Sequence, residues 1–92
     1  MNAETRALSR KLAKALRINP VEDFPRRMVT ASGLLDLDHP EAAATLPLLA
    51  GRRVLLCEAD NLWMAGTEDM PWAMQHEQPG HAIADAILRA LA

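Results

Sequence analysis

The sequence predicts an α+β domain in which helices flank a small antiparallel sheet of two or three strands. Three observations support this fold: an amphipathic pattern near each end of the chain, two short β-rich segments joined by turn residues, and an apolar content made mostly of Ala and Leu. The 92 residues suit a single domain, 1–92. A mostly helical fold with one β-hairpin is the alternative.

The first predicted element is a helix over about residues 3–17. Its apolar side chains recur on one side, which should pack against the domain: Leu8, Leu12, Ala15 and Leu16. Four basic side chains recur on nearly the opposite side: Arg6, Arg10, Lys14 and Arg17. The helix should end near Ile18, because Asn19 precedes Pro20 and the residue before a proline avoids the helical region.

A second helix is predicted over about residues 40–50, after a connection in which Val29 and Thr30 have some strand character. Asp38 or His39 can cap this helix, and Gly51 stands where a helix end favours a left-handed residue. Pro47 should kink the helix or split it into a short helix and a turn, because a proline inside a helix removes a backbone hydrogen bond.

A hairpin is predicted over about residues 53–66, with strands 53–58 and 62–66 and a turn around Asp60 and Asn61. The alternation in "WAMQHE", residues 72–77, suits a third, half-buried strand. An amphipathic helix over about residues 81–91 closes the domain, with Asp85 and Arg89 spaced to form an ion pair on its outer side.

Cysteine usage and the N-terminal residues bear on the compartment. The single cysteine, Cys57, excludes an intramolecular disulfide, and a small secreted domain would usually contain several. The N-terminal residues mix charged and apolar side chains and do not resemble a signal peptide, and no apolar run is long enough to span a bilayer. We therefore expect a cytoplasmic protein without a membrane contact, in which Cys57 is a buried core residue.

The stretch "HEQPGH", residues 76–81, differs by one spacing from the H-E-x-x-H motif of zinc proteases. Pro79 and Gly80 separate the two histidines and should prevent a helix that presents both rings on one face. A loop could still bring His76 and His81 together, with Asp69, Glu77 or Cys57 as further ligands. We expect a loop without a metal, a catalytic residue or a cofactor, because no phosphate-binding or nucleophile motif accompanies it.

Basic residues are concentrated at the start of the chain, where residues 1–27 hold seven of the ten against three acidic residues. The stripe on the first helix could follow a phosphate backbone, so its four members are candidate nucleic-acid contacts: Arg6, Arg10, Lys14 and Arg17. No aromatic residue lies among them and the net charge of the chain is −2, which favours a solvated helix face.

The largest apolar side chains are concentrated in residues 63–74. They could form the heavy end of the core, or a surface for a protein partner, since aromatic and thioether groups are common at interfaces. The candidate protein-interaction residues are Trp63, Met64, Met70, Trp72 and Met74.

Three segments in order give the chain a resemblance to the small phage ABA-sandwich proteins: "DLDHPEAAATLPLL", with its D-x-D-x-x-E-A-A start, the Trp-containing strand pair "VLLCEADNLWMAG", and the Ala-rich "HAIADAILRALA". That family is associated with phages or prophages and has no established activity or functional residues. The resemblance implies a layered helix-sheet-helix fold and a bacterial or prophage origin, although Pro47 departs from the uninterrupted second helix of the family.

These observations favour a non-enzymatic protein-interaction module whose partner is unidentified and which could be a homodimer. One alternative is a nucleic-acid-binding accessory protein that uses the basic first helix. A second alternative, less favoured, is a metal-dependent enzyme built around His76 and His81.

Overall fold

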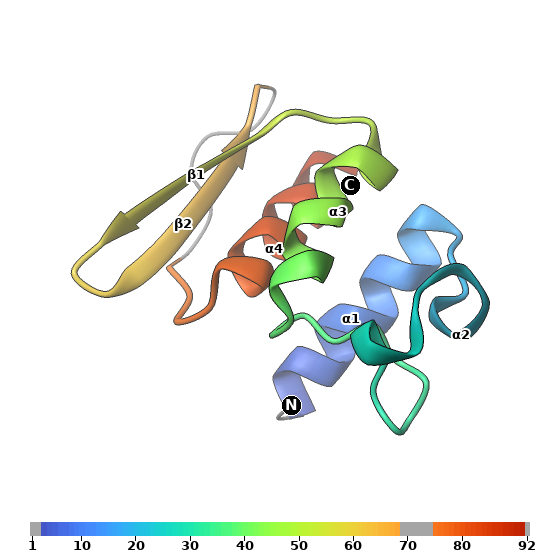
Figure 1. Ribbon diagram of the computed structural model, residues 1–92. Helices are drawn as coiled ribbons and strands as arrows, with labels where there is room; N and C mark the ends of the chain where they lie inside the picture. Colours follow the sequence, from blue (N-terminus) through green and yellow to red (C-terminus); the bar gives the residue numbers. More distant parts are fainter. Residues whose placement is uncertain (1–2, 69–74, 92) are drawn as a thin grey trace.

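The computed structural model describes residues 3–68 and 75–91 (Figure 1). Within these residues the predicted α+β fold is confirmed: helices accompany one two-stranded antiparallel sheet. The elements in chain order are α1 (Ala3–Leu16), α2 (Pro20–Asp23), a 3-10 helix (Arg26–Met28), α3 (Pro40–Ala50), β1 (Val54–Ala59), β2 (Leu62–Thr67) and α4 (Pro79–Leu91).

The C-terminal helix α4 lies at the centre of the fold. It contacts α1, α3 and both strands, so that the hairpin lies on one side of α4 and α1 on the other (Figure 1). Apolar and small side chains surround much of the helix, as expected for an element packed on several sides. Its buried residues are Gly80, Ala82, Ile83, Ala84, Ala86 and Ile87.

Helix α1 confirms the first predicted helix, but its buried face differs from the predicted apolar stripe. Leu12 is buried, whereas Ala15 is exposed, and the polar residues Thr5 and Ser9 are buried in its place. Ser9 can be buried because its hydroxyl donates a hydrogen bond to the backbone carbonyl of Leu35, 2.9 Å away. Compared with the predicted apolar stripe, the buried face of α1 is therefore turned toward Thr5 and Ser9.

The connection between α1 and α3 contains more structure than predicted. Asn19 caps α2 by accepting a hydrogen bond from the Val21 N–H. The strand character near Val29 is limited to an isolated bridge between Val29 and Leu35. The Arg27 guanidinium donates two hydrogen bonds to Glu41, at 2.7 and 3.1 Å, and thereby joins the 3-10 helix to the start of α3.

Helix α3 has the predicted ends. The Glu41 N–H donates to Nδ1 of His39, which is the N-cap, and Gly51 adopts the left-handed conformation at the C-terminus with φ of 63°. The predicted split at Pro47 is wrong, because the helix runs from Pro40 to Ala50 in one piece. Only one helical turn follows Pro47. The Pro47 carbonyl accepts a hydrogen bond from the Arg52 N–H, which lies beyond Gly51, so this end of the helix keeps its backbone hydrogen bonds.

Helix α4 begins two residues earlier than predicted, because Pro79 and Gly80 form its first turn. A proline fits there without loss, since the first N–H groups of a helix have no partner inside it. Gly80 allows this turn to approach the Leu37 carbonyl, which a Cβ atom would overlap. The predicted Asp85–Arg89 ion pair is confirmed, with a distance of 3.3 Å.

The predicted third strand is reduced to one contact in the described residues. His76 forms an isolated bridge with Trp63 on the outer edge of β2, and Gln75 is in no regular element. Residues 72–74 lie outside the described residues.

Candidate functional site

The hairpin has a regular register and a two-residue turn. Val54 lies opposite Thr67, Ala59 lies opposite Leu62, and every position between them is paired without a bulge. Asp60 and Asn61 both have positive φ, 53° and 63°, as the tight turn of a right-twisted hairpin requires. The predicted hairpin is thus confirmed, with β1 shifted by one residue and β2 longer by one residue at its end.

Strand β1 is exposed along almost its whole length. Val54 is half-buried and the five residues after it are exposed, whereas the last three residues of β2 are buried. Two large aliphatic side chains face solvent here, with exposed fractions of 46% for Leu55 and 41% for Leu56. The helices therefore cover β2 and leave β1 as an apolar outer strand.

The two faces of the hairpin differ in what covers them. Val54, Trp63 and Ala65 share one face and belong to, or pack against, the hydrophobic core. Leu56 shares that face but is only partly covered. The side chains on the opposite face include Leu55 and Cys57 on β1.

The prediction that Cys57 is buried is wrong, because it is exposed. "VLLCEA" is as apolar as a core strand, but Cys57 lies on the face of the hairpin opposite Trp63 and Ala65, and so away from the hydrophobic core. The Cys57 thiol donates a weak hydrogen bond to the Glu58 carbonyl oxygen at 3.8 Å, and the described residues contain no group of three or more His, Cys, Asp or Glu side chains that could hold a metal.

The structure describes two of the five predicted protein-interaction residues. Trp63 is half-buried, packs against the core, and exchanges backbone hydrogen bonds with His76 at 2.7 and 2.9 Å. Met64 is half-buried on the opposite face, with its sulfur 4.0 Å from the Gln75 amide nitrogen. The other three, Met70, Trp72 and Met74, lie outside the described residues.

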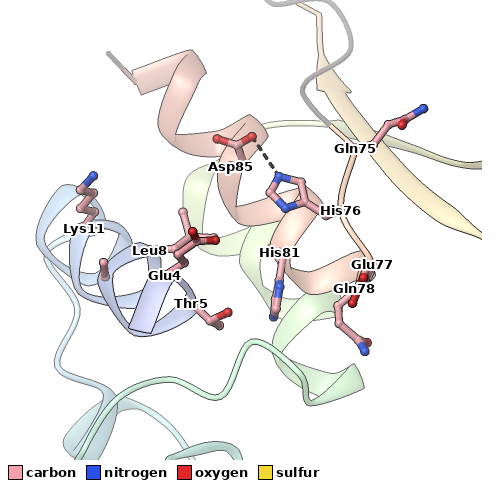
Figure 2. Close-up of a pocket in the computed structure, with 11 residues that line it drawn as sticks. Glu4, Thr5, Leu8, Lys11, Gln75, His76, Glu77, Gln78, His81 and Asp85 are labelled. Carbon is pink, nitrogen blue, oxygen red and sulfur yellow. Dashed lines mark hydrogen bonds and ion pairs between the residues drawn. The ribbon is translucent and has the colours of Figure 1, made fainter. Parts of the chain in front are cut away.

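A polar cleft of about 730 Å³ lies between α1 and the start of α4 (Figure 2). Residues 75–78 form one part of its wall, and His81 and Asp85 contribute from α4. Helix α1 supplies Glu4, Thr5, Ala7, Leu8 and Lys11. The sequence did not predict this cleft, because α1 and residues 75–85, which form its two walls, lie far apart in the chain.

Both histidines of "HEQPGH" line this cleft and each is held by an aspartate. Nε2 of His76 lies 3.1 Å from Oδ2 of Asp85 (Figure 2). Nε2 of His81 lies 2.7 Å from Oδ1 of Asp38. The two rings are nearly perpendicular, with centroids 6.4 Å apart. The first contact joins the segment before α4 to α4, and the second joins α4 to the segment before α3.

The loop does bring the two imidazoles together, as the metal hypothesis required. A metal needs further ligands, and residues 3–68 and 75–91 contain no group of three or more His, Cys, Asp or Glu side chains that could hold one. Asp69 lies outside these residues. The geometry supports structural ties between elements more directly than a metal centre.

The basic stripe on α1 is exposed. All four side chains, Arg6, Arg10, Lys14 and Arg17, face solvent. In the part of the chain that the structure describes, none of them forms an ion pair with an acidic side chain. This surface is separate from the hairpin, because α4 lies between them (Figure 1).

None of the helices in the described residues combines the length and the apolar character needed to cross a bilayer. Comparison of the chain with protein-family models, with curated proteins and with solved structures finds no match.

Proposed function

We propose that this chain is a non-enzymatic protein-interaction module that binds its partner through the hairpin. The observation that carries the proposal is the exposure of β1, a regular six-residue strand with two solvent-facing leucines. An outer strand with unpaired backbone groups is a template for another strand, and two strands alone are marginally stable. A partner strand would supply both missing hydrogen bonds and apolar cover.

Photo-crosslinking tests this proposal. A photoreactive amino acid replaces Leu55 on β1 in the full chain, and in a matched control it replaces Val21, an aliphatic residue on α2 with an exposed fraction of 65%. We expect a discrete protein adduct in cells from position 55 and none from position 21. Equal labelling from both positions, or no adduct from position 55, would contradict a binding surface on the hairpin.

A second candidate function is nucleic-acid binding through α1. It is favoured by four exposed basic side chains without ion pairs in the described residues, three of which recur at four-residue intervals along one helix face. Such a row can follow phosphates, whose binding releases counterions and weakens steeply with salt.

Fluorescence anisotropy with labelled random duplex and single-stranded DNA tests this second function. Salt-sensitive binding that is lost when Arg6 and Arg10 are both replaced by Gln would support it, with the double variant Arg52→Gln and Arg53→Gln as a control that removes the same charge outside α1. Flat titrations at low salt would reject it. The cytoplasmic location and the phage or prophage origin stay predictions.

A further inference from the structure

We propose that the partner of β1 is a second copy of this chain, bound by antiparallel pairing of the two β1 strands. The two hairpins would then form one four-stranded sheet, in the strand order β2, β1, β1, β2. This inference rests on the proposed function, since it names the partner of the same surface.

The backbone of β1 is oriented for such pairing. Trp63 uses its N–H and C=O for His76, on the side of β2 away from β1. Glu58 lies opposite Trp63 and therefore belongs to a pair that exchanges no hydrogen bonds within the hairpin. The N–H and C=O of Glu58 therefore point to the outer edge of β1. Because backbone groups alternate between the two edges of an antiparallel strand, those of Leu56 and Val54 also point to the outer edge.

The protective feature of β1 at this edge is the charge of Glu58, which lies near one end of the strand on its helix-facing side. Soluble proteins usually protect an edge strand with a lysine, a proline or a bulge. "VLLCEA" contains neither residue, and its register with β2 is continuous. Among residues 3–68 and 75–91, no strand pairs with the outer edge.

Charge at the two ends of β1 selects a second copy in antiparallel orientation. Arg53 precedes the strand, whereas Glu58 and Asp60 stand at its other end, and all three are exposed. Antiparallel pairing places the basic end of each strand beside the acidic end of its copy, twice in one dimer. Parallel pairing would place like charges together, which is unfavourable.

The register follows from the outward-pointing residues. The backbone groups of Val54, Leu56 and Glu58 all form hydrogen bonds in both strands when the two-fold axis passes between Leu56 and its copy. Leu56 then lies opposite Leu56 of the copy, and Val54 lies opposite Glu58 of the copy. The two half-covered Leu56 side chains then cover each other on the helix-facing side. Arg53 lies opposite Ala59 of the copy, so the basic end of each strand lies beside the acidic end of the other, although the Glu58 side chain projects from the opposite face of the sheet.

Sedimentation equilibrium of the full chain tests the proposal. We expect a concentration-dependent dimer that is weakened about fivefold by Glu58→Arg, because each dimer then brings basic residues together at both junctions between the strand ends. The double variant Arg53→Glu with Glu58→Arg should restore dimerisation to within about twofold of the unaltered chain, since it restores opposite charges. Leu56→Lys should weaken the dimer, whereas Leu48→Lys, on the exposed part of α3, should not.

Cys57 gives an independent readout without any substitution, because it is the single cysteine and is exposed. The proposed register places the two Cys57 Cα atoms within about 10 Å of each other. A nitroxide label there should show dipolar broadening that disappears on dilution with unlabelled protein.

The outcomes separate this inference from the function on which it rests. A monomer at all concentrations would overturn the homodimer, while a crosslink from position 55 to a different protein would leave the interaction function standing. A dimer that is unaffected by Glu58→Arg and by Leu56→Lys, with no dipolar broadening, would also overturn the inference, because it would use another surface.

Discussion

The hydroxyl of Ser9 donates a hydrogen bond to the backbone carbonyl of Leu35 across 26 residues of sequence, inside the buried contact between α1 and the segment before α3. The Ser9→Ala variant removes the donor and leaves that carbonyl buried without it. We expect the free energy of unfolding to fall by about 1–3 kcal/mol in urea denaturation followed by circular dichroism. Ser32→Ala, at an exposed turn position, should change it by less than about 0.5 kcal/mol.

Helix α3 offers a matched pair of leucines that differ in burial. Leu46 is completely buried, whereas Leu48 has an exposed fraction of 82%. Leu46→Ala should lower the free energy of unfolding by about 2–5 kcal/mol, because it leaves a cavity in the core. Leu48→Ala should change it by less than about 0.5 kcal/mol. Equal effects in the same denaturation assay would contradict the placement of α3 against the core.

At Gly80 we expect a substitution to alanine to change the stability in the opposite direction from the usual one. Alanine in place of glycine within a helix normally stabilises by about 0.5–1 kcal/mol. At position 80 the added Cβ would overlap the Leu37 carbonyl oxygen, so we expect Gly80→Ala to destabilise by about 1–3 kcal/mol or more. Thermal unfolding gives the sign, and Gln78→Ala just before the helix is the control. A stabilised Gly80→Ala variant would contradict this close approach.

The Arg27–Glu41 contact predicts a pH effect of known sign. The hydrogen bonds from the guanidinium, aided by its charge, hold the pKa of the Glu41 carboxyl below its ordinary value. The stabilisation is therefore present at neutral pH and is lost as the pH falls through this lowered pKa. Titration of the Glu41 carboxyl by NMR should show a higher pKa in Arg27→Gln and no change in Arg53→Gln, which removes an equal charge elsewhere.

Local signals in the sequence predicted most of the elements. The turn at Asp60 and Asn61, the cap at His39 and the end of α3 at Gly51 depend on residues next to one another, and each appears where expected. The short helix α2 and the 3-10 helix were missed, because neither is long enough to produce a period.

Burial was harder to predict, since it depends on contacts between distant elements. Ser9 is buried because its hydrogen-bond partner lies in another segment, which no helical period reveals. Strand β1 is more apolar in sequence than β2, yet α4 covers β2, and Cys57 lies on the face of the hairpin away from the core. The two histidines of "HEQPGH" show the same limit, because their partners lie outside that stretch: Asp38 comes from the connection before α3 and Asp85 from α4.

The central position of α4 has a consequence for synthesis of the protein on the ribosome. Residues 3–68 are made first, but α1, α3 and the hairpin each bury their apolar side chains against a helix that is translated after them. Contacts between α1 and α4 join the two ends of the domain, and contacts so distant in sequence form slowly. We expect the nascent chain to stay open and accessible to chaperones until α4 emerges, and to fold in one step only then.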